Sequence, residues 1–293
     1  MKEIVIISGK GGTGKTSLTA SLAALSQRSI LADCDVDAPD LHLILKPDVM
    51  EHHSFISGHE AIIRPENCTG CGICKSRCRF DAVRDDDPTG IHRIDPVSCE
   101  GCGVCVFACP SRAIDFPERT CGAWFVSRTR YGSMVHAQLG IGSENSGKLV
   151  SVVRKEAKKL AESNPTDLLI VDGPPGIGCP VIASITGSDH ILAVTEPSLS
   201  GLHDLERVME LVRHFKIPMS VCINKWDINP ELSERINALS EKAGVTLLGR
   251  IPYDGRLSQA QRAGQSLIEY APDSPSAEAV TQIWNRLCQI LNR

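Results

Sequence analysis

Long apolar runs, secretory signals and a strong charge of either sign are all missing from this sequence. No apolar run reaches the ~18 residues that a membrane-spanning helix needs. The start of the chain, Met1 to Ser8, reads as a short strand and has neither the length nor the cleavage site of a signal peptide. The formal net charge of −4 gives no indication of binding to nucleic acid or to an anionic membrane. We therefore expect a cytoplasmic protein that binds neither.

The cysteine content is high for such a protein. Eight of the 13 cysteines fall between Cys68 and Cys109, and the other five are scattered singly. A disulfide scaffold would require an oxidising compartment, and a chain of 293 residues can bury a core without disulfides. The cysteines therefore indicate metal binding.

Short apolar segments alternate with amphipathic ones along both ends of the chain. Strands are predicted at 2–8, 30–32, 168–171, 191–195, 219–223 and 247–251, and helices at 202–215 and 231–243. This alternation predicts an α/β fold with a doubly wound, mostly parallel sheet, formed jointly by residues 1–62 and 118–293. Residues 63–117 are predicted to form a small inserted α+β domain. A ligand site is expected at the carboxyl ends of the parallel strands.

A glycine-rich loop follows the first strand and matches the pattern G-x-x-x-x-G-K-[ST], a phosphate-binding loop (P-loop). Its glycines allow backbone N–H groups to approach phosphate oxygens. Lys15 is expected to reach the β- and γ-phosphates, and the Thr16 hydroxyl to bind Mg²⁺. A glycine turn without a ligand is the alternative. The expected nucleotide contacts in this segment are Gly9, Lys10, Gly11, Gly12, Thr13, Gly14, Lys15, Thr16 and Ser17.

Carboxylates follow two other predicted strands. Asp33-Cys34-Asp35-Val36-Asp37 ends the second strand, and Asp172 follows the apolar run 168–171. A carboxylate at a buried strand end is costly without a cation, which favours a metal role for Asp172. One or more of the aspartates after the second strand could instead cap the helix that follows.

The cysteine-rich segment contains two copies of the bacterial ferredoxin pattern C-x₂-C-x₂-C-x₃-C, the second followed by Pro110. In such ferredoxins the fourth cysteine of each motif binds the other cluster, so two 4Fe–4S clusters are expected. Cluster one would take Cys68, Cys71, Cys74 and Cys109, and cluster two would take Cys99, Cys102, Cys105 and Cys78. Structural zinc, the alternative, uses cysteine pairs separated by a long gap. Arg79 stands where proline usually follows the fourth cysteine.

Together these motifs resemble the deviant-Walker P-loop ATPases of the MinD/ParA/Mrp superfamily, with an inserted two-cluster ferredoxin domain. Much of this resemblance rests on Lys10, a lysine near the start of the loop in addition to Lys15. It implies an ATP-driven homodimer in which Lys10 reaches the nucleotide of the partner subunit. It also implies catalytic roles for Lys10, Lys15, Asp35 and Asp172, with Asp35 organising the attacking water or a Mg²⁺-bound water and Asp172 holding Mg²⁺ through water. Asp37 and Asp40 are alternates for Asp35.

The resemblance also suggests where the base binds. Asn224-Lys225-Trp226-Asp227 ends a strand, and asparagine at this place commonly contacts adenine in the family. The same N-K-x-D pattern occurs in GTPases, where the aspartate selects guanine, so Asp227 keeps the base identity open although the family favours ATP. The segment 251–254 resembles a later loop beside the base, with Pro252 as the expected contact. A proline-anchored turn is the alternative.

Three functions fit this combination. The first is an ATPase that gates electron transfer from two clusters to a client metalloprotein, and the second is an assembly factor for iron–sulfur or other metal centres. The third is a ParA/MinD-like positioning or partner-binding switch, with the ferredoxin domain as a docking module. Cys179, with Cys121 as a conceivable partner, suggests an additional bridging cluster, but a buried structural cysteine is the commoner explanation.

Overall fold

The structure, a computed structural model, describes residues 1–86, 90–140, 142–143, 145–164 and 166–292. It divides into two compact units. The large unit comprises Met1–His52, Trp124–Gln138 and Ser146–Arg293, and the small unit comprises His53–Ala123 and Leu139–Asn145. The expected boundaries of the ferredoxin domain, 63 and 117, stay a prediction.

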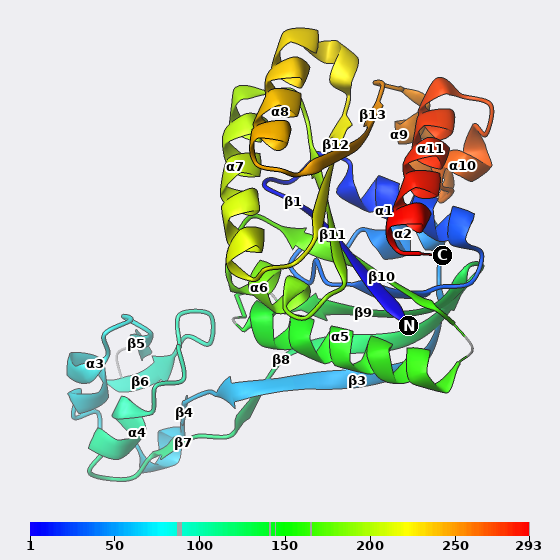
Figure 1. The fold of residues 1–293 in the computed structure, drawn as a ribbon. Helices are drawn as coiled ribbons and strands as arrows, with labels where there is room; N and C mark the ends of the chain where they lie inside the picture. Colours follow the sequence, from blue (N-terminus) through cyan, green and yellow to red (C-terminus); the bar gives the residue numbers. More distant parts are fainter. Residues whose placement is uncertain (87–89, 141, 144, 165, 293) are drawn as a thin grey trace. The chain divides into compact units, whose positions relative to one another are not determined.

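Nine strands form one sheet in the order β13-β12-β11-β1-β10-β2-β9-β8-β3 (Figure 1). The strands are β1 (Lys2–Ser8), β2 (Ile30–Asp33), β3 (Asp48–His59), β8 (Glu118–Thr129), β9 (Gly132–Leu139), β10 (Leu168–Pro175), β11 (His190–Thr195), β12 (Met219–Asn224) and β13 (Thr246–Ile251). Every neighbouring pair from β13 to β9 is parallel. The predicted α/β fold with a large, mostly parallel sheet is confirmed.

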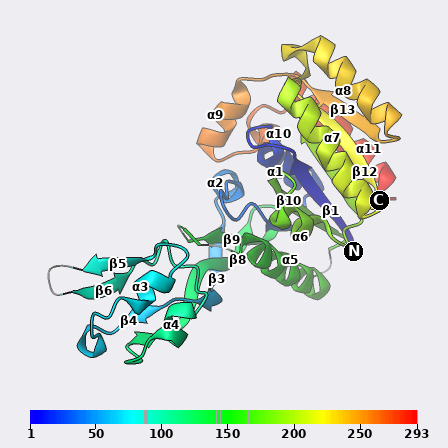
Figure 2. The same ribbon diagram turned by 90° about the vertical axis from the view of Figure 1, so that its left-hand side faces the viewer.

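The helices of the large unit form two groups (Figures 1 and 2). One contains α1 (Lys15–Ser26), α2 (Leu41–Leu45), α9 (Arg256–Ala263), α10 (Leu267–Tyr270) and α11 (Pro275–Ile290), which contact one another. The other contains α5 (Ser146–Ser163), α6 (Cys179–Ile185), α7 (Leu199–His214) and α8 (Pro230–Lys242); α5 packs on α6 and α7 on α8. None of the described helices is long and apolar enough to cross a membrane.

The sheet buries side chains on both faces. Ile4 and Ile6 of β1 share one buried cluster with Leu18 and Leu22 of α1, while Val5, between them in sequence, points to the opposite face and is also buried. Coverage of both faces explains why these strands read as continuous apolar runs. The short 3₁₀ turn η2 (Trp226–Ile228) follows β12.

Besides parts of β3, β8 and β9, the described residues of the small unit form two short antiparallel strand pairs and two one-turn helices. β4 (Ile62–Ile63) pairs with β7 (Ile114–Asp115), and β5 (Val83–Asp86) pairs with β6 (Ile91–Ile94). The remaining elements are η1 (Pro65–Asn67), α3 (Ile73–Arg77) and α4 (Val104–Ala108), of which α3 and α4 contact each other. Cysteines form much of its buried cluster, beside Ile63, Val83 and Ile114.

Candidate functional site

Four strands of the large unit end at the same edge of the sheet, and each carries a polar group there. The glycine loop follows β1, Asp33 ends β2, Asp172 lies in β10 and Asn224 ends β12. The parallel register pairs Asp172 with both Ile6 of β1 and Asp33 of β2. Residues far apart in sequence are thereby collected at the carboxyl ends of the strands, where α/β sheets bind ligands.

Asp172 is fully buried and accepts hydrogen bonds from three side chains of α1. Its Oδ1 accepts from Lys15 Nζ at 2.9 Å and from Thr19 Oγ1 at 2.9 Å, and its Oδ2 accepts from Thr16 Oγ1 at 2.7 Å. Asp35 Oδ2 lies 3.6 Å from Lys15 Nζ. The arrangement brings Lys15, Thr16, Asp35 and Asp172 together. Asp37 and Asp40 are exposed, and the Asp40 side chain does not cap α2.

The charges in this cluster alter one another's protonation. Burial alone would lower the pKa of Lys15, but the carboxylates of Asp172 and Asp35 outweigh it and raise that pKa. Burial and the neighbouring Asp172 raise the pKa of Asp33 well above its usual value. Burial also raises the pKa of Asp35, although Lys15 acts in the opposite direction. Three carboxylates thus lie around one ammonium group in a largely buried site, and a divalent cation would relieve their repulsion.

The glycine loop is open at Gly11 and Gly12 and tightly packed at Gly14. Gly12 and Gly14 have positive φ angles of 78° and 89°. A Cβ on Gly14 would collide with the Asn224 side chain, whereas a Cβ built on Gly11 or Gly12 would have no described atom within 4 Å outside its own chain neighbours. Thr13 is buried, and its Oγ1 has no hydrogen-bond partner among the described residues. The loop therefore presents open space and an unsatisfied hydroxyl, as a phosphate cradle would.

Lys10 is held within its own chain. Its Nζ lies 2.7 Å from Glu196 Oε1 and donates to the hydroxyls of Ser198 and Ser200. Glu196 also pairs with Lys225 at 3.0 Å, and Lys225 donates to the carbonyl of Gly12. Burial would raise the pKa of Glu196, but hydrogen bonds from Lys10 and Lys225 outweigh it and lower that pKa.

The residues expected near the base have partners inside the protein. Asn224 donates through Nδ2 to the Thr13 carbonyl at 2.7 Å, which ties β12 to the glycine loop. Asp227 Oδ1 accepts the backbone N–H of Tyr253 at 2.7 Å, next to Pro252. The Ser17 hydroxyl accepts from Gln261 at 2.7 Å. One carboxylate oxygen of Asp227 is thus already used to hold the loop at 252–253.

Residues 4–268 match the family described as the CobQ/CobB/MinD/ParA nucleotide-binding domain. The chain belongs to this family. An uncharacterized protein of Methanocaldococcus jannaschii is 34% identical over 235 residues, covering 78% of this chain and 79% of that protein. An iron–sulfur cluster carrier protein of Pyrococcus horikoshii is 23% identical over 303 residues, covering 97% of this chain and 85% of the carrier.

Solved structures of this nucleotide-binding family share the fold. The septum site-determining protein MinD of Pyrococcus horikoshii, solved with Mg-ADP, superimposes with a TM-score of 0.61 over 99% of this chain and 97% of MinD. Its identity to this chain is 18%, so the likeness concerns the fold alone. A ParA family ATPase of Chlorobium tepidum gives a TM-score of 0.58 at 17% identity, over 97% of this chain and 98% of that protein.

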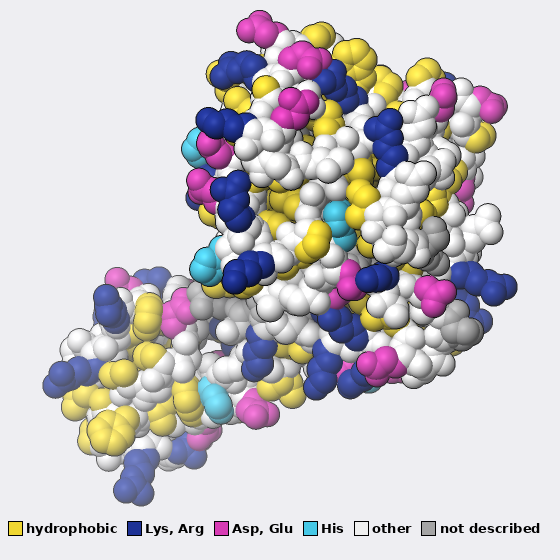
Figure 3. Space-filling model, in the orientation of Figure 1, with side chains coloured by type: hydrophobic (Ala, Val, Ile, Leu, Met, Phe, Trp, Pro, Cys, Tyr) yellow, Lys and Arg dark blue, Asp and Glu magenta, His cyan; other side chains and the backbone are white. Residues whose placement is uncertain are grey.

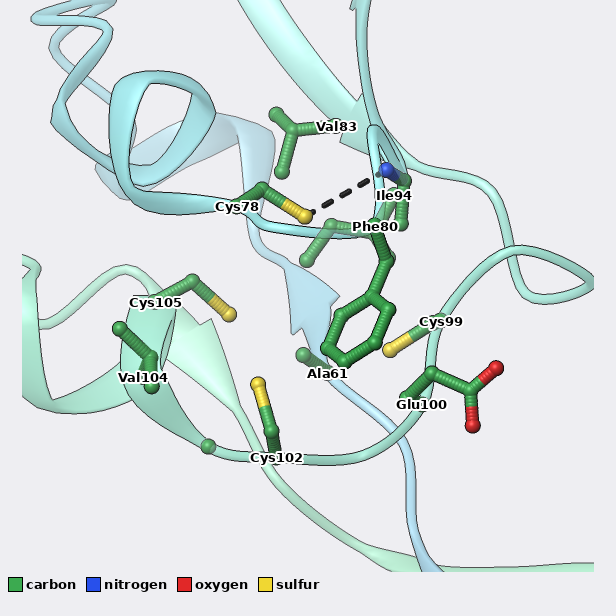
Figure 4. Close-up of a pocket in the computed structure, with 12 residues that line it drawn as sticks. Ala61, Cys78, Phe80, Val83, Ile94, Cys99, Glu100, Cys102, Val104 and Cys105 are labelled. Atoms are coloured by element: carbon green, nitrogen blue, oxygen red, sulfur yellow. Dashed lines mark hydrogen bonds between the residues drawn. The ribbon is translucent and has the colours of Figure 1, made fainter.

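In this family member, the small unit has two cavities lined by cysteines. One is lined by Cys78, Cys99, Cys102 and Cys105, whose sulfur atoms face a common space in Figure 4. The other is lined by Cys68, Cys71, Cys74 and Cys109. Each cavity thus takes three cysteines from one motif and one from the other.

Backbone groups and burial affect the sulfur atoms around both cavities. The backbone N–H of Ala82 donates to Cys78 Sγ at 3.4 Å, and that of Ala113 donates to Cys109 Sγ at 3.3 Å. Burial raises the pKa of the Cys105 thiol to about 11, and the nearby Cys99 acts in the same direction. At Cys109 burial is outweighed by hydrogen bonds, first from Ser111, and the pKa falls.

In the described ranges of the chain, no three His, Cys, Asp or Glu side chains converge closely enough to bind one metal ion. The four cysteines of each set line a cavity and do not converge on a position that a single ion could occupy. Arg79 is exposed beside Cys78. Cys179 lies exposed at the start of α6, and Cys121 is buried with its thiol donating to the Ser57 carbonyl at 3.0 Å.

Three residues at these sites were not expected from the sequence. Thr19 holds Asp172, Glu196 holds Lys10, and His92 lines the cavity of Cys68, Cys71, Cys74 and Cys109. Of these, only Glu196 carried a usable signal, because it directly follows an apolar strand, as Asp172 and Asn224 do.

Proposed function

We propose that this protein is a Mg²⁺-dependent ATPase that works as a dimeric switch and carries two 4Fe–4S clusters. Its output would be electron transfer to a client metalloprotein or the assembly of a metal centre. The observation that carries the proposal is the pair of cavities in the small unit, each lined by four cysteines in the crossed pattern of a two-cluster ferredoxin.

The donor set suits cubane clusters better than single ions. Four sulfur ligands spaced around a cavity can grip separate iron atoms, whereas one zinc ion would require them to converge. His92 supports this view: it is buried at the cavity of Cys68, and neither ring nitrogen has a hydrogen-bond partner of good geometry among the described residues. Its Nδ1 lies 3.2 Å from Asp85 Oδ1. An Nε2 atom that has no hydrogen-bond partner among the described residues, beside such a cavity, suits a cluster whose sulfur atoms accept hydrogen bonds.

The end of the sheet is suited to Mg-ATP. The open loop at Gly11 and Gly12 and the unpaired Thr13 hydroxyl would receive phosphate oxygens, with the N-terminus of α1 behind them. Thr16 would hold Mg²⁺ directly, and Asp35 and Asp172 would hold it through water. The ion would neutralise charge developing on the phosphates. Lys15 would then turn from Asp172 towards the β- and γ-phosphates.

Nucleotide hydrolysis and cluster content are tested together on anaerobically purified protein. We expect Mg²⁺-dependent ATP turnover and about eight iron and eight sulfide per chain. Lys15→Ala should lower the turnover number by at least ~10²-fold, the usual loss when a group that stabilises the transition state is removed, with iron content and helical content unchanged. Wild-type turnover in that variant would refute the ATPase assignment, and a chain that binds zinc in place of iron would refute the clusters.

Dimerisation is tested through Lys10, whose ammonium would leave Glu196 and neutralise phosphate charge on the partner's nucleotide. Light scattering of Asp35→Ala, which should bind ATP without hydrolysing it, would report a dimer with ATP and a monomer with ADP. Adding Lys10→Ala should abolish the dimer. Replacing ATP with GTP distinguishes adenine recognition through Asn224 from guanine recognition through Asp227. If the site recognises adenine, GTP should support neither dimerisation nor turnover.

A further inference from the structure

The surface over α3 and α4 of the small unit is unusually apolar. Phe107 is 96% exposed, Val104 is 48% exposed, and Ile73 also lies at the surface. They line one shallow groove together with Arg77 and Cys102. Figure 3 shows hydrophobic side chains gathered over these two helices, with Lys and Arg side chains beside them. Contiguous exposed apolar surface rimmed by polar residues is a feature of protein–protein interaction sites.

The groove shares a wall with one of the cysteine cavities. Cys102, Gly103 and Val104 line both the groove and the cavity formed with Cys78, Cys99 and Cys105. Cys102 is itself exposed. A protein seated in the groove would therefore be separated from the contents of that cavity by little more than this cysteine, and electron tunnelling is fastest over the shortest gap.

The internal repeat shows that cysteine ligation does not require this apolar surface. Lys75, Ser76 and Arg77 occupy in the first half the positions that Val106, Phe107 and Ala108 occupy in the second. The two halves have the same cysteine spacing and similar one-turn helices. The polar half shows that a ring at position 107 is dispensable for binding a cluster, so Phe107 needs another explanation.

The charges around the groove indicate the partner. Arg77 is the one charged side chain among the described residues that line it. Lys75, on the same helix, is paired with Asp85. The groove thus offers an aromatic anchor next to a guanidinium group that has no carboxylate beside it in the groove lining. Such a surface complements an apolar patch edged by carboxylates.

We propose that this groove docks an acidic one-electron carrier protein, which exchanges electrons with the centre bound by Cys99, Cys102, Cys105 and Cys78. The inference rests on the proposed function, because it requires a cluster in that cavity. With a cluster held by these four cysteines, one electron would pass from it to the flavin or iron centre of the carrier, and no bond would be made or broken. The first half, with Lys75-Ser76-Arg77 in the equivalent place, would not serve as the exit.

The test uses the holoprotein with oxidised flavodoxin, an acidic flavoprotein, as the probe. Titration calorimetry should show binding that weakens at least tenfold in Phe107→Ser, the residue found at the equivalent position of the first half. Val97→Ser, which removes another exposed apolar side chain that lies outside the groove lining, should bind like the wild type. Arg77→Ala should bind more weakly at low salt and should reduce the salt dependence of affinity.

Electron transfer gives the second measurement. After reduction with dithionite, Phe107→Ser should pass electrons to flavodoxin at least tenfold more slowly, yet reduce methyl viologen at the wild-type rate. Equal affinity and equal rates in wild type and Phe107→Ser, with both clusters shown by iron content and EPR, would overturn the docking surface alone. Sedimentation showing that Phe107 mediates self-association, without flavodoxin binding, would overturn it too. Absence of clusters would instead refute the proposed function.

Discussion

Asp172 depends on Thr19 as well as on the residues of the glycine loop. Thr19 is fully buried, and its hydroxyl lies 2.9 Å from Asp172 Oδ1 and 3.0 Å from the Lys15 carbonyl. Hydrogen bonds offset the free-energy cost of removing a carboxylate from water. If one of its donors is removed, part of this desolvation cost is no longer compensated. Thr19 therefore positions the carboxylate that we expect to hold the Mg²⁺ water.

Thr19→Val, which keeps the shape of the side chain but removes its hydroxyl, should lower the free energy of unfolding by about 1–3 kcal/mol. It should also raise the Mg²⁺ concentration needed for half-maximal ATP turnover. Thr19→Ser keeps the hydroxyl and should retain the wild-type Mg²⁺ requirement. Denaturant unfolding and Mg²⁺ titration measure the two effects. An unchanged Mg²⁺ requirement in Thr19→Val would show that Asp172 does not depend on this hydroxyl.

At the scale of a single element, β11 carries a buried histidine. His190 lies at the start of the strand, and its Nε2 is 2.9 Å from the Ser220 hydroxyl of β12. Burial lowers the pKa of His190 to about 4. Between its unfolded pKa of about 6.5 and this folded value, the unfolded chain binds a proton that the folded chain does not. Stability should therefore fall as the pH falls through this window.

His190→Gln should remove that contribution. The wild type loses at most about 1.4 kcal/mol of unfolding free energy per pH unit through this histidine. The difference in unfolding free energy between wild type and His190→Gln should thus shrink from pH 7 to pH 5. Guanidinium unfolding of the large unit at pH 7, 6 and 5 measures it. A difference that stays constant with pH would show that His190 is not held neutral by the fold.

The cysteines that follow the two short helices of the small unit lead to a prediction about which cluster each of them binds. Cys78 directly follows α3 and Cys109 directly follows α4, but each lines the cavity of the other motif's three cysteines. Cys109→Ser should therefore damage the cluster of Cys68, Cys71 and Cys74, and Cys78→Ser the other one. EPR of the reduced proteins distinguishes the two signals, with the variants serving as controls for each other. Loss of the cluster nearer in sequence in either variant would contradict the crossed ligation.

At the scale of the whole molecule, the two units are linked repeatedly by the chain. It passes between them after His52, Ala123, Gln138 and Asn145. β9, whose last residue Leu139 belongs to the small unit, pairs in the sheet with β2, which ends at Asp33 beside the proposed nucleotide site. A conformational change at the end of β2 can therefore be transmitted along paired strands into the segments that enter the small unit.

We expect nucleotide state and cluster potential to be coupled. A ligand shifts an equilibrium only by its differential affinity, and the coupling is reciprocal, so a form favoured by ATP must in turn favour ATP over ADP by the same factor. A tenfold coupling corresponds to about 59 mV for a one-electron couple. Potentiometric titration followed by EPR, in the apo form, with ADP and with a non-hydrolysable ATP analogue, measures the shift. Lys15→Ala is the matched control and should give one potential under all three conditions.

Identical potentials and identical oxidation rates in the three wild-type states would argue against coupling. The clusters would then act as an electron store or a docking module, and the assembly-factor function would be favoured over gated electron transfer.

The sequence by itself determined the features that depend on local spacing. The glycine pattern at Gly9–Thr16 requires a strand before it and a helix after it, and β1 and α1 supply them. Continuous apolar runs such as 168–171 are buried strands because both faces of the sheet are covered. β3, β8 and β9 of this sheet were not foreseen. The side chains of β3 and β8 are mostly exposed or half-buried and their sequences lack such a run, and in β9 a buried histidine, His136, interrupts the apolar residues.

Only the tertiary structure decided which side chains meet. Lys10 reaches Glu196, Asp172 is held by Thr19, and His92 lies at a cysteine cavity. Lys10 and Glu196, like Thr19 and Asp172, lie more than a hundred positions apart and are brought together by the order of the strands, which no local pattern encodes. The groove at Phe107 is a similar case: the repeat shows that the ring is dispensable for cysteine spacing, but only the fold shows that Cys102 lines the same groove as Phe107. Spacing fixes a local conformation, whereas a contact between distant residues depends on the path of the whole chain.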